Sequence, residues 1–178
     1  ASYFGIAAPS TGIIAPGLSG NRASNLVPSE ANVAKAKQLL SESGESNVSL
    51  RLAILNKQAN VTTAQIVQAN LAAIGITLEI DLHEGATFWG LGSDESLELV
   101  LNRYSMTPDP YYATSWFTCE QAGVWNWERH CNEEFDKIHN EGPRELDNNK
   151  RDAMYQRAQD IMEESGAYKF ITHEASPV

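Results

Sequence analysis

Two cysteines, Cys119 and Cys131, have a spacing that suggests covalent chemistry. They lie in a loop-rich stretch and could form a disulfide, remain as two buried free thiols, or join His130 and His139 in a metal site. A structural zinc site normally has four ligands, and this spacing matches no zinc finger or ribbon. We therefore favour a disulfide, which would stabilise the chain by roughly 3 kcal/mol in the chain-entropy picture. A disulfide in turn implies an oxidising compartment.

The stretch from Arg103 to Tyr112 is the second candidate for chemistry, because two prolines and several aromatic residues follow a predicted strand. Trp116, Phe117 and Trp125 come shortly after it. Open α/β sheets place ligands at the carboxyl ends of their strands, and aromatic side chains line many small-molecule sites. A packed loop that covers the edge of the sheet explains the same residues equally well.

Catalysis has little support in the sequence. The four histidines are scattered over unrelated elements, and the chain lacks a nucleophile elbow, a glycine-rich dinucleotide loop, a Walker loop and a zinc-protease helix. Adjacent acidic residues point in different directions, which is poor geometry for paired acid–base work. The sequence indicates no cofactor and no metal site, and a hydrolase that uses His130 or His139 is the least favoured alternative.

Composition excludes several classes of partner. The chain has 178 residues, is 42% hydrophobic, and carries 23 acidic against 13 basic residues, for a net charge of -10. This charge disfavours nucleic acid and anionic lipid as partners, because both require clustered Lys and Arg. The longest apolar runs are much shorter than the roughly 18 residues that a membrane-spanning helix needs. We therefore expect no direct membrane insertion.

The first 28 residues are rich in proline and glycine, which predicts an extended arm or loop. Ser29 is a suitable N-cap for a helix that ends at Gly44, and alternating apolar residues predict a strand over 48–54. A second helix, capped by Asn60 or Thr62, ends at Gly75 in a left-handed conformation. Apolar residues alternate again over 76–82. This strand–helix–strand order predicts two parallel strands with a right-handed crossover.

The remaining elements complete an α/β domain. A third strand is expected around 97–101, followed by an irregular stretch from 105 to about 131. Asn132 is expected to cap a short helix that ends at Gly142-Pro143, and Asp147 opens a longer one to about Ser165. Residues 167–173 are predicted to form a last strand. The expected architecture is one compact domain with helices packed on a mostly parallel or mixed sheet.

Five short motifs now occur in an order that matches a known family. The arm is followed by a Lys- and Leu-rich helix, a crossover helix that ends in Gly-Ile, a Pro-Asp-Pro loop, the cysteine pair before an Asn-x-x-Phe-Asp helix, and a Lys-Arg helix. These motifs lie at residues 32–44, 65–76, 108–110, 119–136 and 150–159. Over about residues 3–174 the chain resembles the C-terminal lobe of periplasmic dipeptide- and oligopeptide-binding proteins of ABC importers, which are bacterial extracellular solute-binding proteins of family 5.

This resemblance implies a fold, a function and a location. The fold would be one lobe of a type II periplasmic binding protein, a mixed sheet flanked by helices. Residues 1–28 would then form an arm that crosses from a missing N-terminal lobe, and 29–178 would form the C-terminal lobe. The two lobes would close on a peptide or peptide-like solute and deliver it to the permease subunits of the importer. The protein would lie in the periplasm, or outside the cell next to the transporter.

The resemblance also selects the residues expected to contact the solute. They are Arg103, Tyr104, Met106, Asp109, Tyr111, Tyr112, Trp116 and Trp125. Peptide binders of the family commonly carry an Asp at the position of Met106, where it pairs with the ammonium group of the ligand. Met106 cannot do so, whereas Arg103 could meet an anionic group. An interaction domain, with the aromatic loop packed on a partner chain, remains the alternative to a solute receptor.

Overall fold

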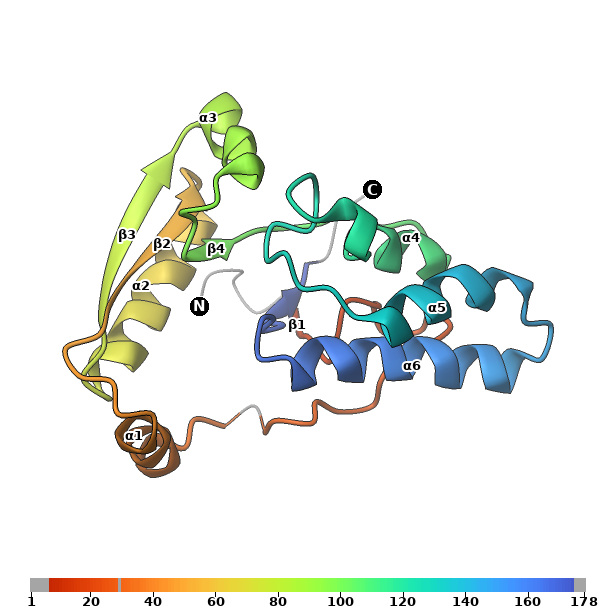
Figure 1. Ribbon diagram of the computed structural model, residues 1–178, viewed down its shortest axis with the longest axis horizontal. Helices are drawn as coiled ribbons and strands as arrows, with labels where there is room; N and C mark the ends of the chain where they lie inside the picture. The colour runs from red at the N-terminus through yellow and green to blue at the C-terminus, as the bar shows by residue number, and fades with distance from the viewer. Residues whose placement is uncertain (1–6, 29, 175–178) are drawn as a thin grey trace. The chain divides into compact units, whose positions relative to one another are not determined.

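The computed structural model describes residues 7–28 and 30–174, which fall into two compact units (Figure 1). Residues 30–103 form one of them, which we call the sheet unit. Residues 7–28 and 104–174 form the other, which we call the helical unit. The sequence predicted one compact domain from residue 29 onward, whereas the structure groups the arm with the C-terminal half of the chain. The relation of either unit to a further lobe stays a prediction.

The sheet unit is built on three parallel strands, in agreement with the predicted crossover. They are β2 (Ser49–Leu55), β3 (Thr77–His83) and β4 (Leu99–Leu101), in the order β3-β2-β4. Leu52 is in register with Ile80 on one side and with Leu99 on the other. Because the strands are parallel, their carboxyl ends meet at one edge, where Asn56, Glu84 and Asn102 follow them.

Helix α2 (Gln58–Ala72) covers one face of this sheet and buries its apolar side. The core consists of Leu52, Ile54 and Leu78 from the strands with Ala64 from the helix. The helix begins earlier than predicted, after Lys57, and Asn60 lies inside it with its side-chain amide donating to the carbonyl of Leu55 at 3.1 Å. Gly75 has the predicted left-handed backbone, with φ of 90°.

Three other helices of the sheet unit differ from prediction. Helix α1 (Val33–Glu42) is capped by Asn32, whose side chain accepts from the N–H of Lys35 at 2.9 Å, and the predicted cap Ser29 lies outside the described residues. None of the α1 side chains is buried. Helix α3 (Gly85–Gly90) and the 3₁₀ helix η1 (Leu91–Ser93) were not predicted. Their sequence is too short for a helical repeat to show, and Phe88 anchors α3 with 1% exposure.

The helical unit contains three α-helices and two 3₁₀ helices. They are α4 (Pro110–Ser115), η2 (Cys119–Gln121), α5 (Glu133–Glu141), η3 (Gly142–Arg144) and α6 (Asn148–Glu164). The caps predicted for the two long helices are confirmed, because Asn132 accepts from the N–H of Phe135 and Asp147 from those of Asn149 and Lys150. The stretch predicted to be irregular contains α4 and η2 instead.

Helices α5 and α6 pack side by side over the core of the helical unit (Figure 1). The core combines Phe135 and Ile138 of α5 with Tyr155, Ile161 and Met162 of α6. Ala113 of α4 and Phe117, which follows α4, also belong to this core. The arm contributes Ile14, which has no exposed surface.

The arm is not a loose segment in its described part. Strand β1 (Ala8–Pro9) pairs antiparallel with β5 (Thr172–His173). The strand predicted over 167–173 is therefore shorter than expected and covers two residues. Arg22 is 5% exposed and forms ion pairs with Asp160 at 2.7 Å and Glu163 at 2.8 Å. The arm therefore folds as part of the helical unit.

Candidate functional site

The two cysteines form a disulfide, as predicted, with their Cα atoms 4.6 Å apart. The bond closes the segment from Cys119 to Cys131, which we call the disulfide loop. The backbone N–H of Cys119 donates to the Asp136 carboxylate on α5, at 3.0 and 3.3 Å from its two oxygens. The disulfide thus joins the two ends of the loop to each other, and hydrogen bonds from Cys119 attach the loop to α5.

Asn126 holds the disulfide loop from inside. Its side chain has no exposed surface, and its amide nitrogen donates to the carbonyls of Phe117, Thr118 and His130 at 3.3, 3.2 and 2.7 Å. Its side-chain oxygen accepts from the hydroxyl of Tyr168 at 3.2 Å. Buried backbone carbonyls need such partners, so this amide adds side-chain hydrogen bonds to the backbone turns of the loop.

Three of the expected solute-contacting residues, Tyr104, Trp116 and Trp125, lie in the first of two aromatic groups. Tyr104 lies 6.0 Å from Trp116 and 5.0 Å from Phe117, measured between ring centroids. Trp116 in turn meets Trp125 edge-on at 5.1 Å, and the Tyr104 hydroxyl donates to the carbonyl of Trp125 at 2.9 Å. Met106 packs on the same core. Trp125 is 41% exposed, so this group reaches the surface through the disulfide loop.

The second aromatic group lies at the start of α4. Tyr111 stacks on His139 of α5 with ring centroids 4.4 Å apart and planes 15° from parallel. Tyr112 meets Tyr111 edge-on at 5.5 Å and is 53% exposed. His139 is buried, and burial lowers the pKa of its imidazole despite the nearby carboxylate of Asp136, which opposes the shift. A neutral His139 accepts or donates one hydrogen bond at Nδ1, where the hydroxyl of Thr114 lies at 2.8 Å.

The carboxylate of Asp109 is occupied by contacts with other residues of the protein. It caps α4 by accepting from the N–H of Tyr111 at 2.9 Å. Both of its oxygens also lie 2.9 Å from Nη2 of Arg151 on α6. The structure therefore gives Asp109 a helix-capping and ion-pairing role that the sequence did not indicate.

Arg103 belongs to the other unit. It is the last residue of the sheet unit, follows β4 and is exposed, whereas the other seven expected residues lie in the helical unit. The structure thus brings together Tyr104, Trp116 and Trp125 in one group and Tyr111 and Tyr112 in another, while Met106 packs on the core of the helical unit. A direct solute contact by any of these residues stays a prediction.

Sequence reasoning missed a polar pair at the end of the disulfide loop. Among the described residues, Oε2 of Glu128 and Nε2 of His130 are buried and have no hydrogen-bond partner. Between them, Arg129 has a φ of 52°, which a non-glycine residue seldom adopts. Burial raises the pKa of Glu128, and the charge of Glu128 adds to burial in raising the pKa of Tyr168. The sequence of residues 127–130, Trp-Glu-Arg-His, has no periodic pattern that would predict the burial of Glu128 and His130.

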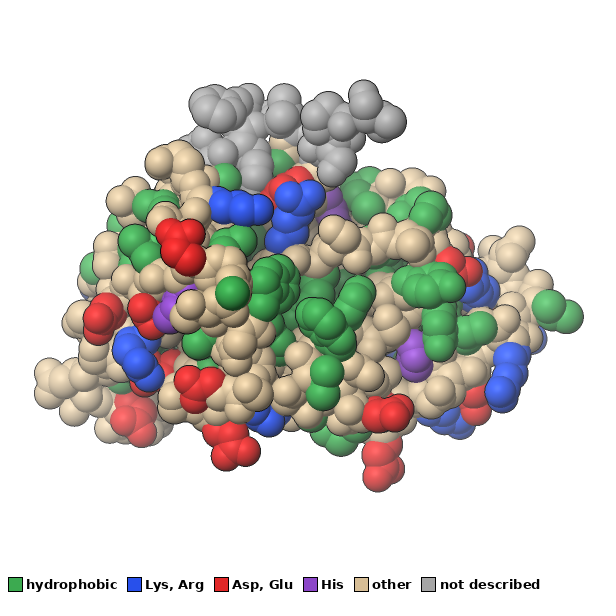
Figure 2. All heavy atoms as spheres, turned by 90° about the horizontal axis from the view of Figure 1, so that it is seen from above, with side chains coloured by type: hydrophobic (Ala, Val, Ile, Leu, Met, Phe, Trp, Pro, Cys, Tyr) green, Lys and Arg blue, Asp and Glu red, His purple; other side chains and the backbone are tan. Residues whose placement is uncertain are grey.

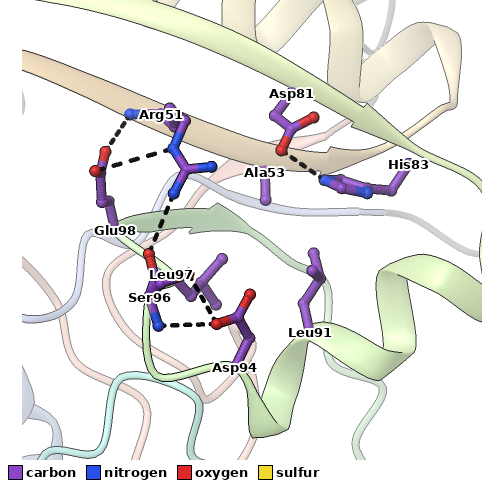
Figure 3. Close-up of a pocket in the computed structure, with 9 residues that line it drawn as sticks. All are labelled: Arg51, Ala53, Asp81, His83, Leu91, Asp94, Ser96, Leu97 and Glu98. Carbon is purple, nitrogen blue, oxygen red and sulfur yellow. Dashed lines mark hydrogen bonds and ion pairs between the residues drawn. The ribbon is translucent and has the colours of Figure 1, made fainter.

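The sheet unit has a small polar pocket on the face of the sheet that α2 leaves open (Figure 3). Arg51 of β2 lies there near Glu98, and Asp81 of β3 lies 2.9 Å from Nε2 of His83. The pocket has a volume of about 30 Å³, room for about one water molecule. Solute pockets are usually ten times larger. Among the described residues, no group of His, Cys, Asp and Glu is arranged to hold a metal ion.

Exposed acidic side chains are scattered over the face shown in Figure 2, with hydrophobic side chains between them. Basic side chains do not dominate this face. Exposed Trp125 and Tyr112 therefore offer apolar contact surface within an acidic protein. Such surface suits binding of a small organic molecule more than binding of a polyanion.

Comparison with known protein families decides the class. The family model described as bacterial extracellular solute-binding proteins, family 5 Middle, matches residues 1–124. The chain belongs to this family. The family 5 match confirms the resemblance seen in the sequence motifs. Proteins of this family are described as extracellular, and a disulfide such as Cys119–Cys131 is typical of an oxidising compartment.

Solved structures of similar fold include HbpA2 and two binding proteins. The family 5 chain superposes on HbpA2 from Haemophilus parasuis with a TM-score of 0.87 and 22% identity, over 97% of this chain and 35% of that one. It superposes on a dipeptide binding protein from Pseudoalteromonas sp. SM9913, in complex with Met-Leu, with a TM-score of 0.88 and 24% identity, over 97% and 36%. For DppA from Helicobacter pylori, in complex with the peptide STSA, the values are 0.80 and 22%, over 95% and 34%.

These likenesses establish the fold of a periplasmic binding protein for this family 5 chain, which is the predicted α/β class. The chain spans about a third of the length of these structures. None of the curated proteins compared matches it. In the described part of the chain, every helix is too short or too polar to cross a membrane.

Proposed function

We propose that the protein is the solute-binding component of an ABC importer and that its solute is a peptide or a peptide-like molecule. Membership of the family 5 solute-binding proteins is the observation that carries this proposal. Two proteins of the same fold support the choice of solute, because one is described with Met-Leu and the other with the peptide STSA. The role is binding rather than catalysis.

Capture would involve two lobes. The chain spans about a third of its structural relatives, and we propose that it supplies one wall of the solute site while a further lobe supplies the other. Closure of the two lobes would be stabilised by a solute that contacts both. The closed form would then be received by permease subunits at the membrane, in the periplasm or outside the cell.

The solute surface that we propose consists of Tyr112 with Tyr111, and Trp125 with Trp116. Flat aromatic faces accept side chains of many kinds, which suits a receptor for varied peptides. Arg103 would add a positive group for a carboxylate. Asp109 is a weaker candidate, because Arg151 and the N–H of Tyr111 already occupy its carboxylate.

A titration followed by NMR tests the proposal. The isotope-labelled protein is titrated with Met-Leu and with Ser-Thr-Ser-Ala, and the indole N–H signals of Trp116 and Trp125 are followed together with the amide of Tyr112. We expect these signals to shift with a weak affinity, because one lobe makes only part of the contacts. Trp125→Ala and Tyr112→Ala should each weaken binding by about tenfold.

Leu146→Ala is the matched control, because Leu146 is a hydrophobic side chain with 93% exposure outside both aromatic groups. This variant should bind as the unmodified protein does. Shifts that appear only at other surfaces, or no shifts with either peptide, would contradict the proposal. Saturation at micromolar concentration would contradict the two-lobe part of it.

A further inference from the structure

Helix α4 carries Tyr111 and Tyr112 but is too short to hold its own orientation. It has six residues, and isolated helices shorter than about 12 residues are marginal in water. Its position therefore comes from its packing in the helical unit, where Ala113 is part of the core and Thr114 lies 2.8 Å from Nδ1 of His139, and from the cap at its start. Pro110 at the first position and Asp109 as the cap define where the helix begins.

The cap itself is held by Arg151. One guanidinium nitrogen of Arg151 lies 2.9 Å from each oxygen of Asp109, which restricts the rotation of that carboxylate. The cap accepts from Tyr111 through one of the same oxygens, Oδ1. The orientation of the first turn of α4 is thus coupled to the position of a side chain on α6.

Arg151 is also fixed on its other sides. Its Nε donates to the carbonyl of Gly142 at 3.1 Å, and its guanidinium lies 5.2 Å from the centre of the Tyr155 ring. Its side chain is 18% exposed, against 46% for Asp109. A methyl group at Gly142 would collide with the Tyr155 ring, so this junction is closely packed. Arg151 therefore ties α4 to the end of α5 and to α6.

We propose that Arg151 is a positioning residue for the solute surface: through Asp109 it holds α4 so that Tyr112 and Tyr111 face the solute. This inference rests on the proposed function, because it deepens the role of that surface. Arg151 does not touch the solute. Arg151→Ala should therefore weaken peptide binding while the protein stays folded.

Arg157 provides the matched control on the same helix. It forms ion pairs with Glu134 and Glu164 at 2.9 Å each, and its side chain is 40% exposed. Its ion pairs join α6 to α5 and to its own last turn, without a contact to α4. Arg157→Ala thus removes an arginine with two ion pairs but leaves the cap of α4 intact.

The test measures amide hydrogen exchange and peptide affinity for Arg151→Ala, Arg157→Ala and Asp109→Asn. The N–H of Tyr112 donates to the carbonyl of Asp109 at 3.1 Å and reports on the first turn of α4. In Arg151→Ala we expect this amide to exchange about tenfold faster and Met-Leu to bind about tenfold more weakly. Arg157→Ala should change neither quantity.

Asp109→Asn is the second variant, in case Arg151→Ala fails to fold. Asparagine caps helices well but forms no ion pair with Arg151, so this variant removes the ion pair and keeps the cap. It should show the same two effects in a smaller degree. Unchanged exchange at Tyr112 in both variants, or equal affinity losses in the Arg151 and Arg157 variants, would overturn the inference. If the unmodified protein binds no peptide, the proposed function fails, while hydrogen exchange still decides whether Arg151 orients α4.

Discussion

The hydroxyl of Tyr168 donates to the side-chain oxygen of Asn126 at 3.2 Å, which joins the segment after α6 to the disulfide loop. Asn126 is at the same time the donor to three backbone carbonyls. One buried amide therefore links both ends of the disulfide loop to the segment after α6.

Replacement of Asn126 by alanine should be strongly destabilising. It would leave buried carbonyls without donors, each at a cost of about 1–3 kcal/mol, so we expect a loss of about 3 kcal/mol in the free energy of unfolding. Urea denaturation followed by tryptophan fluorescence measures this loss. Asn140→Ala is the control, because Asn140 is exposed and donates one hydrogen bond to the carbonyl of Asp136. A loss at Asn126 as small as at Asn140 would show that the loop does not depend on this amide.

Reduction of the disulfide should loosen the loop without unfolding the helical unit. The bond closes a separation of 12 residues, which contributes roughly 3 kcal/mol in the chain-entropy picture. We expect the urea midpoint to fall when a reductant is added. A double Cys119→Ser, Cys131→Ser variant should show the lower midpoint with and without reductant. If reductant shifts the double variant as well, the effect has another source.

The burial of Glu128 predicts a pH dependence of stability. Burial raises the pKa of this carboxyl above its ordinary value of 4.5, so the folded state binds the proton more tightly than the unfolded chain does. Stability from this group is complete below pH 4.5 and is lost as the pH rises toward the folded pKa. Glu128→Gln should therefore be more stable than the unmodified protein at pH 7 and nearly equal to it at pH 4.

Thermal unfolding at several pH values measures this difference. Glu120→Gln is the control, because Glu120 lies in the same loop and is exposed. It should run parallel to the unmodified protein at every pH. A Glu128→Gln variant with the same pH dependence as the unmodified protein would refute the prediction.

The arm should detach when its buried arginine is removed. Arg22→Ala would leave Glu163, which is 4% exposed, without its cation, and breaking a buried ion pair costs about 3–5 kcal/mol. We expect faster cleavage of residues 7–28 by a protease at neutral pH. Arg51→Ala is the control, because the Arg51 side chain is 52% exposed and its Nε lies 3.9 Å from Oε1 of Glu98. Equal cleavage of the two variants would contradict this reading of the arm.

Acid should have a similar effect on the arm. Although burial alone would raise the pKa of Glu163, hydrogen bonds from the N–H groups of Leu26 and Val27 and from Arg22 outweigh it, so the pKa of Glu163 is lowered. The stability that this carboxylate contributes is present above pH 4.5 and is lost as the pH falls through its lower folded pKa. The protection of the Leu26 and Val27 amides against exchange, measured relative to their intrinsic rates at each pH, should therefore fall below pH 4.5.

Local patterns predicted most of the regular elements. Alternation at Leu50, Leu52 and Ile54 and the helical stripe before Gly75 were enough to predict the parallel pair, because each pattern has one buried face. The caps Asn132 and Asp147 were predicted because their side chains bond to nearby N–H groups. Such short-range chemistry is visible in one stretch of sequence.

Long-range contacts were not predictable in the same way. The Asp109–Arg151 pair joins residues 42 positions apart, and the charge of Glu128 acts on the pKa of Tyr168, 40 positions later. Neither relation leaves a local periodicity. The candidate surface was therefore predicted as a set of residue types, while its division into two aromatic groups and the capping role of Asp109 required the structure.

The place of the arm determines when each part of the chain can fold. In the described chain the sheet unit is one continuous segment, so it can form as soon as residue 103 has been synthesised. The helical unit cannot be completed then, because Arg22 must wait for Glu163, 141 positions later. Within the described chain the arm is therefore synthesised before the sheet unit but acquires its permanent contacts only after α6 has been made.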